Sequence, residues 1–214
     1  MTPQRILWYF ADPMCSWCWG FAPVFSAIRD TYADRVKIAL MLGGLRPGTT
    51  EPMTSGGREE ILQHWRDVRR MTGQPFAFEG ALPEGFVYDT EPPSRAVIAV
   101  GEINAGAVFP YFKSVQEAFY AHGQNVVQAD TLAALAQHHN IEPAVFHDRF
   151  DSDAIRKKTR THFQIARESG VRGFPTVILQ SGNTGMLLTH GYRPFAELQP
   201  AIDQWLAQPE SRDE

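Results

Sequence analysis

The two cysteines of this chain restrict its fold and chemistry more than any other feature. They are Cys15 and Cys18, the only cysteines among 214 residues. Residues 6–10 form an apolar run before them, and residues 5–10 are predicted to be a buried parallel strand. Residues 15–32 carry apolar side chains at helical spacing. A C-x-x-C pair that follows a strand and opens a helix is typical of thiol–disulfide redox sites.

A zinc site is the alternative use of a C-x-x-C pair. Such a site would need two further ligands, and the chain has no third cysteine. Its seven histidines include no two at the H-x3–5-H spacing that zinc sites use. We therefore expect no metal.

The charge and the first residues set expectations for partners and location. A net charge of −4 and a pI near 6.0 give no electrostatic basis for binding nucleic acid or anionic membranes. Two basic clusters, at residues 66–70 and 156–160, are interpreted as solvated helix faces. No apolar run approaches the ~20 residues that span a bilayer, and residues 1–5 lack the apolar core of a signal peptide. We expect a cytoplasmic protein that binds neither nucleic acid nor membrane.

The order of predicted elements indicates an α/β fold in two discontinuous parts. Outside the middle of the chain the pattern predicts strand 5–10, helix 15–32, strand 36–42, strand 176–179, strand 186–189 and helix 194–206. These pieces form a thioredoxin-like βαβ–ββα core. We assign residues 1–48 and 165–214 to this discontinuous domain and residues 49–164 to a large all-helical insertion.

Helical patterns fill most of the insertion. The expected helices are 58–71, 94–104, 109–121, 131–139, 142–150 and 153–169. Ser94 follows two prolines and is predicted to cap the second of these helices, and Asp130 is predicted to cap the fourth. Either Ser152 or Asp153 is predicted to cap the last.

The position of each cysteine on its helix predicts its role. A thiol at a helix N-terminus meets unpaired backbone N–H groups and the positive end of the helix dipole, which stabilise the reactive thiolate. Cys15 is therefore predicted to be the exposed nucleophile. Cys18 lies about one turn deeper and is predicted to resolve a mixed disulfide on Cys15. The reaction class is dithiol–disulfide exchange.

The residues around the cysteines have two interpretations each. Trp17 lies between the cysteines, where burial of its ring is hard to combine with an accessible Cys15, so we expect it to contact substrate. Trp19 and Phe21 are expected in the core. Asp12 is either part of a turn before the helix or a proton acceptor for a thiol, and the turn is favoured.

A second motif, Gly-Val-Arg-Gly-Phe-Pro-Thr, lies at residues 170–176. Together with Cys15, Cys18 and the long helical insertion, it resembles the DsbA-like branch of the thioredoxin superfamily. The run Asp-Pro-Met-Cys-Ser-Trp-Cys-Trp-Gly-Phe at residues 12–21 is similar to the predicted cytosolic protein-disulfide isomerases of that branch.

The resemblance implies a binding site and partners. It implies a cis bond between Phe174 and Pro175 beside the cysteines, where the backbone of Phe174 pairs with an extended substrate. The predicted substrate-binding residues are Trp17, Phe174, Pro175 and Thr176. Phe174 is interpreted equally well as a packing residue. The implied activity is that of a protein disulfide oxidoreductase or isomerase acting on protein or peptide thiols and disulfides. It has no bound cofactor, glutathione is a candidate redox partner, and a separate partner recycles it. Neither the direction of electron flow nor the oligomeric state follows from the sequence.

Two other functions fit parts of the pattern. A kappa-class glutathione transferase or hydroxychromene-carboxylate isomerase shares the fold, but those relatives typically have serine at the catalytic position and do not require the second cysteine. A non-catalytic peptide-binding or chaperone module would use a groove of the insertion. It would keep its activity when both cysteines are replaced.

Overall fold

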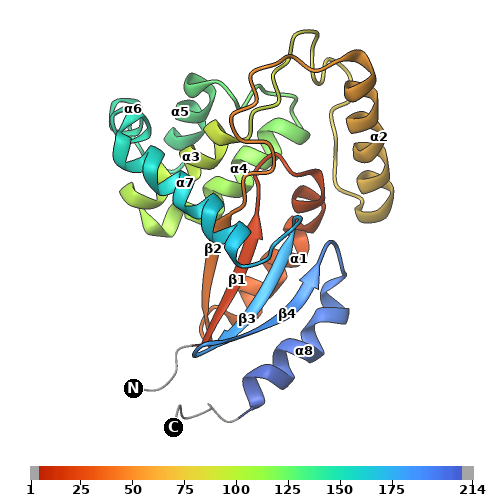
Figure 1. The fold of residues 1–214 in the computed structure, drawn as a ribbon, viewed down its shortest axis with the longest axis vertical. Coiled ribbons are helices and arrows are strands. Elements are labelled where there is room, and N and C mark those ends of the chain that lie inside the picture. Colours follow the sequence, from red (N-terminus) through yellow and green to blue (C-terminus); the bar gives the residue numbers. More distant parts are fainter. Residues whose placement is uncertain (1–4, 209–214) are drawn as a thin grey trace.

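The computed structural model describes residues 5–208 and has an α/β architecture (Figure 1). A four-stranded sheet forms one half of the molecule, and most of the helices form the other. The elements of the sheet half are β1 (Arg5–Ala11), α1 (Ser16–Tyr32), β2 (Lys37–Leu42), β3 (Thr176–Ser181), β4 (Thr184–His190) and α8 (Phe195–Ala207). The predicted βαβ–ββα order is confirmed, and the hairpin strands are longer than the sequence pattern indicates.

The sheet has the strand order β2-β1-β3-β4. β1 and β2 are parallel, whereas β3 runs antiparallel to both β1 and β4. Residues 43–175 separate β2 from β3, yet β3 pairs directly with β1, with Tyr9 opposite Val177 and Phe10 opposite Thr176. The end of β1, which leads to the cysteines, therefore lies beside the start of β3, which follows Pro175.

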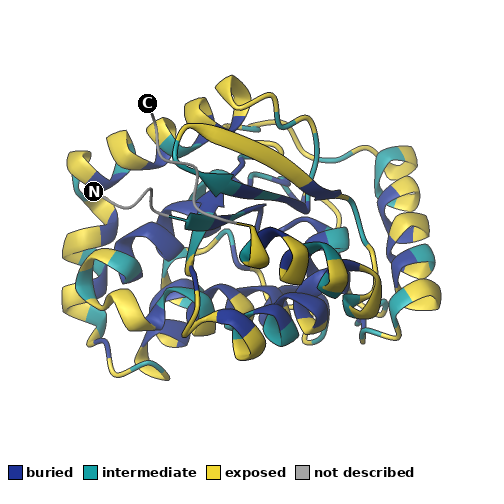
Figure 2. Ribbon diagram, turned by 90° about the horizontal axis from the view of Figure 1, so that it is seen from below, coloured by how far each residue is buried: buried dark blue, intermediate teal, exposed yellow. Residues whose placement is uncertain are grey.

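The two faces of the sheet are covered to different extents. Alternate residues of β1 and β3, such as Tyr9 and Val177, belong to the main core together with side chains of α1 and α8. On the opposite face a small cluster of Phe10, Met41 and Ala166 joins the sheet to α7. Figure 2 shows the buried centre of the molecule and the exposed outer surface, which includes the first four residues of β4.

The insertion is helical, as predicted. Its elements are α2 (Ser55–Thr72), α3 (Glu91–Ile103), the 3-10 helix η1 (Ala105–Ala107), α4 (Val108–Tyr120), α5 (Ala129–Gln137), α6 (Pro143–Asp151) and α7 (Asp153–Glu168). α2 and α4 pack against α1, and α7 packs against β2. Because one continuous cluster of buried side chains joins both halves, the division at residues 48 and 164 stays a prediction.

Two of the predicted helix caps are wrong. α3 is capped at Thr90 rather than Ser94, which is buried inside the helix. The two prolines before Ser94 lie in the first turn, where their missing N–H groups break no intrahelical bond. α5 begins after Gln128, and Asp130 lies in its first turn, where a negative charge complements the helix dipole. Ser152 does cap α7, since its side chain accepts a hydrogen bond from the Ile155 amide.

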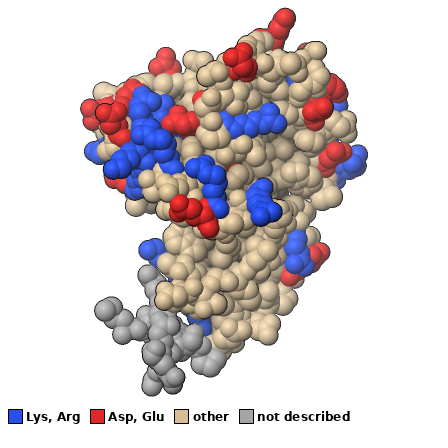
Figure 3. Space-filling view, viewed as in Figure 1, with Lys and Arg blue, Asp and Glu red and all other residues tan. Residues whose placement is uncertain are grey.

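Charged side chains gather on the helical half of the face drawn in Figure 3, where Lys and Arg alternate with Asp and Glu. The two predicted basic clusters carry ion pairs, such as Arg66–Glu59 and Arg156–Asp151, which fits solvated helix faces. The surface over the sheet is largely uncharged in this view. None of the helices within residues 5–208 is both long and apolar enough to cross a bilayer.

Candidate active site

Cys15 occupies the N-cap of α1, so its predicted place at the helix start is confirmed. A tight turn brings it there, because its backbone N–H donates to the Asp12 carbonyl at 3.1 Å. The predicted exposure is wrong, since only 6% of Cys15 is accessible. Its Sγ lies 3.4 Å from the backbone oxygen of Phe174, so the loop before β3 closes over the thiol.

Cys18 lies one turn into α1 and is fully buried. Burial raises the pKa of the Cys18 thiol well above its usual value, and the neighbouring Cys15 raises it further. A hydrogen bond from the Asp12 backbone acts in the opposite direction and lowers that pKa. Both cysteines are free thiols in this structure. The arrangement places one partly covered thiol in front of a second that solvent does not reach.

Asp12 forms the turn that precedes α1, as favoured from the sequence. Its carboxylate accepts hydrogen bonds from the backbone amides of Met14, at 2.9 Å, and Leu45, at 2.7 Å. The side chain has no exposed surface. Burial raises the pKa of Asp12 to about 6, although these two amides and Thr90 oppose the shift. The charge of Asp12 also raises the pKa of Cys18, so a titratable carboxyl with a pKa of about 6 lies close to that thiol.

The loop at residues 173–176 faces the cysteines from β3. The Phe174–Pro175 peptide bond is cis. Two hydrogen bonds hold the loop in place. The Gly191 amide donates to the Pro175 carbonyl at 2.8 Å, and the Thr176 hydroxyl donates to the Gly173 carbonyl at 2.8 Å.

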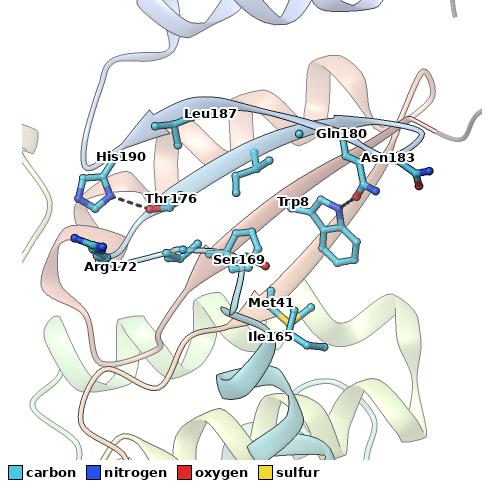
Figure 4. Close-up of a pocket in the computed structure, with 15 residues that line it drawn as sticks. Trp8, Met41, Ile165, Ser169, Arg172, Thr176, Gln180, Asn183, Leu187 and His190 are labelled. Atoms are coloured by element: carbon cyan, nitrogen blue, oxygen red, sulfur yellow. Dashed lines mark hydrogen bonds between the residues drawn. The ribbon is translucent and has the colours of Figure 1, made fainter. Parts of the chain in front are cut away.

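His190 completes the support of this loop. Its Nδ1 lies 3.0 Å from the Thr176 hydroxyl (Figure 4). The single hydroxyl proton is used on Gly173, so His190 Nδ1 donates to Thr176. Thr176 is 3% exposed and its hydroxyl is engaged within the loop. Its direct contact with substrate stays a prediction, as does that of Pro175.

The ring of Phe174 packs against a glycine at the end of β2. A Cβ placed on Gly43 would lie 1.9 Å from the ring Cζ, so the ring occupies the space that any side chain at 43 would need. Phe174 is half-buried and touches both apolar clusters. The packing role of Phe174 is thus present, and its role as a substrate platform stays a prediction.

The G43A variant should be destabilised by about 1–3 kcal/mol, because the added methyl forces the Phe174 ring away and disturbs the carbonyl against Cys15. Urea unfolding measures the change. The matched control is G56A, since a Cβ at this α2 residue meets nothing within 4 Å. G56A should be stabilised by about 0.5–1 kcal/mol, because alanine is the better helix former. Equal effects of the two variants would contradict the packing of Phe174 on Gly43.

The remaining aromatic residues divide as the sequence indicates. Trp19 and Phe21 are buried, and the Trp19 indole donates to the Pro75 carbonyl at 2.9 Å. Trp17 is half-buried at the edge of the core, and its contact with substrate stays a prediction.

Tyr88, from the loop after α2, donates to the Met14 carbonyl at 2.6 Å and fixes the turn before Cys15 from the insertion side.

Four residues that shape the site do not stand out from the sequence: Tyr9, Gly43, Tyr88 and His190. They lie in four different segments, and contacts across the sheet or the insertion bring them together. The pattern of β1 gives one usable signal, because Tyr9 shares a sheet face with Leu7 and Ala11 and must point toward whatever covers that face. Within residues 5–208, no three His, Cys, Asp or Glu side chains form a group that could hold a metal ion.

A large cavity lies on the other sheet face and includes neither cysteine. It has a volume of about 810 Å³ and an apolar wall formed by Trp8, Phe10, Met41, Ile165, Ile178 and Leu187 (Figure 4). The cavity reaches the loop of the candidate site at Thr176 and His190. Size alone would place the site here, but the reactive groups lie on the α1 side of the sheet.

Comparison with known families agrees with this geometry. Residues 6–203 match the family model of the DSBA-like thioredoxin domain. The chain belongs to this family. The match covers both halves of the sheet and the whole insertion, and the predicted fold and family are confirmed.

Several solved structures are similar over nearly the whole chain. A Nitrosomonas europaea protein, provisionally described as a protein disulfide isomerase, is 44% identical with a TM-score of 0.90, covering 95% of this chain and 98% of that one. The cytosolic disulfide reductase DsbM of Pseudomonas aeruginosa is 25% identical with a TM-score of 0.78, covering 94% and 98%. DsbM has also been solved with GSH.

One curated relative carries a different description. The ClpXP adapter protein SpxH of Halalkalibacterium halodurans is 25% identical over 198 residues. These residues are 88% of this chain but 63% of that protein, so the chain spans less than two thirds of the relative's length. Proteins similar to this chain thus carry both redox and adapter descriptions.

Proposed function

We propose that this protein is a thiol–disulfide oxidoreductase that exchanges disulfides with protein or peptide substrates, with Cys15 as nucleophile and Cys18 as resolving thiol. One observation carries the proposal. Cys15 lies at the N-cap of α1 against the Phe174 carbonyl, and Cys18 lies directly behind it in a buried position. Helix N–H groups favour a thiolate at the first position.

The reaction has two steps in which electrons balance. The Cys15 thiolate attacks a substrate disulfide, forms a mixed disulfide and releases the first substrate sulfur as a thiolate. Cys18 then loses its proton, which ends on a released substrate thiol, and attacks Cys15 Sγ, so the Cys15–Cys18 bond forms and the second substrate sulfur leaves. The substrate gains two electrons and the enzyme pair loses them. The reverse sequence oxidises a substrate dithiol.

The substrate binds, in this proposal, across the loop at residues 173–176. Trp17 flanks the cysteines, Phe174 and Pro175 provide the backbone edge, and Thr176 with His190 holds that edge in place. An extended peptide can pair with such an edge. Glutathione is the proposed small redox partner, which the GSH complex of DsbM supports. A separate recycling partner and a cytoplasmic location, the latter supported by the description of DsbM, complete the proposal.

The reduction potential of the Cys15–Cys18 pair is the direct test. Equilibration with glutathione redox buffers should show one two-electron couple, measured as the fraction of protein in which both thiols resist alkylation. A potential near −270 mV, roughly that of thioredoxin, indicates a reductant, and one near −120 mV, roughly that of DsbA, indicates an oxidant. If no disulfide forms between the two cysteines in any buffer, the proposal is wrong.

The alternatives make different predictions in the same protein. A glutathione transferase would keep transferase activity in a Cys15→Ser variant. The 2-hydroxychromene-2-carboxylate isomerase structure, which is 15% identical with a TM-score of 0.66, shows a shared fold alone. A peptide-binding module would suppress aggregation equally well with both cysteines replaced. Neither use would require the paired thiols to exchange disulfides.

A further inference from the structure

Tyr9 lies on the α1 face of β1 and is 1% exposed. Three aromatic rings fix its side chain. It stacks on Phe25 with ring centroids 3.9 Å apart, and it meets Phe112 edge-on at 6.1 Å and Phe21 at 6.0 Å. A ring held from three sides has little freedom to reorient, so its hydroxyl has a fixed position inside the core.

The hydroxyl of Tyr9 is buried and forms no hydrogen bond within residues 5–208. Burial raises the pKa of the Tyr9 hydroxyl most, and the charges of the neighbouring Cys18 and Cys15 raise it further. A buried hydroxyl without a partner destabilises a fold, and a phenylalanine would fill the same space without that cost. Cys18, Phe21 and Phe25 lie at i, i+3 and i+7 on one face of α1, and the Tyr9 ring packs against the two phenylalanines, which places Tyr9 on the Cys18 face of the helix. Packing alone does not require its hydroxyl there.

Cys18 needs a hydrogen-bond donor that stabilises its thiolate. Burial opposes ionisation of Cys18, yet only the thiolate attacks the mixed disulfide. The Asp12 backbone supplies one hydrogen bond that favours the charged form. The Tyr9 hydroxyl is a donor from a second direction, and a hydrogen bond to a charged group is roughly twice as strong as one between neutral groups.

We propose that Tyr9 is a catalytic residue whose hydroxyl donates a hydrogen bond to the Cys18 sulfur when that sulfur is a thiolate. The inference rests on the proposed function and deepens it. As Cys18 attacks Cys15 Sγ, its electron pair enters the new S–S bond, the hydrogen bond from Tyr9 weakens, and the substrate sulfur leaves with the electron pair of the broken bond. Tyr9 keeps its proton throughout. In the reverse reaction Tyr9 stabilises Cys18 as the leaving thiolate.

Stopped-flow reaction with an aromatic disulfide of the dithionitrobenzoate type separates the two steps. The reduced protein releases one coloured thiolate when Cys15 attacks and a second when Cys18 resolves the mixed disulfide. In Y9F the second phase should be about 3- to 10-fold slower at neutral pH, with its pH profile moved to higher pH. The first phase should be unchanged. This range follows because a lost hydrogen bond to the thiolate lowers the thiolate fraction, while the higher pKa partly restores nucleophilicity.

The matched control is Y111F. Tyr111 is also fully buried, and its hydroxyl donates to the Leu132 carbonyl at 2.9 Å in the insertion. Y111F removes the same oxygen but should leave both phases within about twofold of the wild type. Thermal unfolding should show Y9F to be at least as stable as the wild type and Y111F to be less stable. A second phase slowed by about twofold or less in Y9F, or slowed equally in Y111F, overturns the inference.

A second readout keeps the inference separate from the proposed function. In Cys15→Ser protein, which cannot exchange disulfides, the Cβ carbon shift of Cys18 against pH reports its ionisation by NMR. Adding Y9F should move this titration to higher pH, and an unmoved titration overturns the role of Tyr9. If the wild type releases only one coloured thiolate while Y9F moves the titration, the hydrogen bond exists and the proposed redox pairing fails.

Discussion

Cys18→Ser protein should hold substrate polypeptides in a covalent mixed disulfide, whereas Cys15→Ser protein should hold none. The first variant keeps the thiol at the N-cap of α1 but loses the buried thiol that would release the substrate. The second variant cannot form the mixed disulfide. Intramolecular attack by a positioned group corresponds to a very high effective concentration. Turnover should therefore fall by at least ~100-fold in either variant.

Reduction of insulin disulfides, followed by turbidity, measures turnover, and non-reducing electrophoresis after alkylation detects the mixed disulfide. The variant with both cysteines replaced by serine sets the background. Both substitutions are nearly isosteric, and thermal unfolding checks that the fold is intact. Trapping by Cys15→Ser but not by Cys18→Ser would reverse the two roles. Trapping by neither variant would contradict the redox pair itself.

Much of this site could be predicted because the features involved are local in sequence. The helical spacing after Cys15 places one thiol at the helix start and the other one turn in, and the structure has both there. Ser152, one of the two candidate caps of α7, is predictable because capping depends on residues within one turn. Ser94 was misassigned because two prolines can lie inside a first turn as well as before it.

The rest depends on pairing between distant segments, which the pattern of one chain does not determine. Thr176 lies opposite His190 only because the hairpin takes a register with an irregularity between Val177 and Ile178. The Phe174 carbonyl lies against Cys15, and the Phe174 ring fits over Gly43 only because that residue has no side chain. The predicted exposure of Cys15 was wrong for the same reason, since the loop that covers it enters from beyond the insertion.

Asp12→Asn should change how stability depends on pH, by an amount that the buried carboxyl sets. The Asp12 pKa is raised from 3.8 to about 6 in the folded protein because the group is buried. The folded state therefore binds this proton more tightly than the unfolded state does. The resulting stabilisation is fully present below pH 3.8 and is lost as the pH rises through about 6. Over this window the free energy of unfolding of the wild type should fall by about 3 kcal/mol relative to Asp12→Asn.

Urea unfolding of both proteins between about pH 4 and 7 measures this difference. The asparagine side chain keeps only one of the two oxygens that accept backbone N–H bonds, which lowers the free energy of unfolding by about 1–3 kcal/mol at every pH. The result is therefore read from how the difference between the two proteins changes with pH. Glu84→Gln is the control, because that exposed side chain lies in a loop and forms no ion pair among the described residues. Only a slope that this control lacks is assigned to Asp12. A flat difference for Asp12→Asn would mean that Asp12 stays ionised on folding. The Asp12 carboxylate, which lowers stability at neutral pH, also lies near Cys18, the thiol that must lose a proton in the second step. A falling difference would therefore place a group able to take that proton beside Cys18.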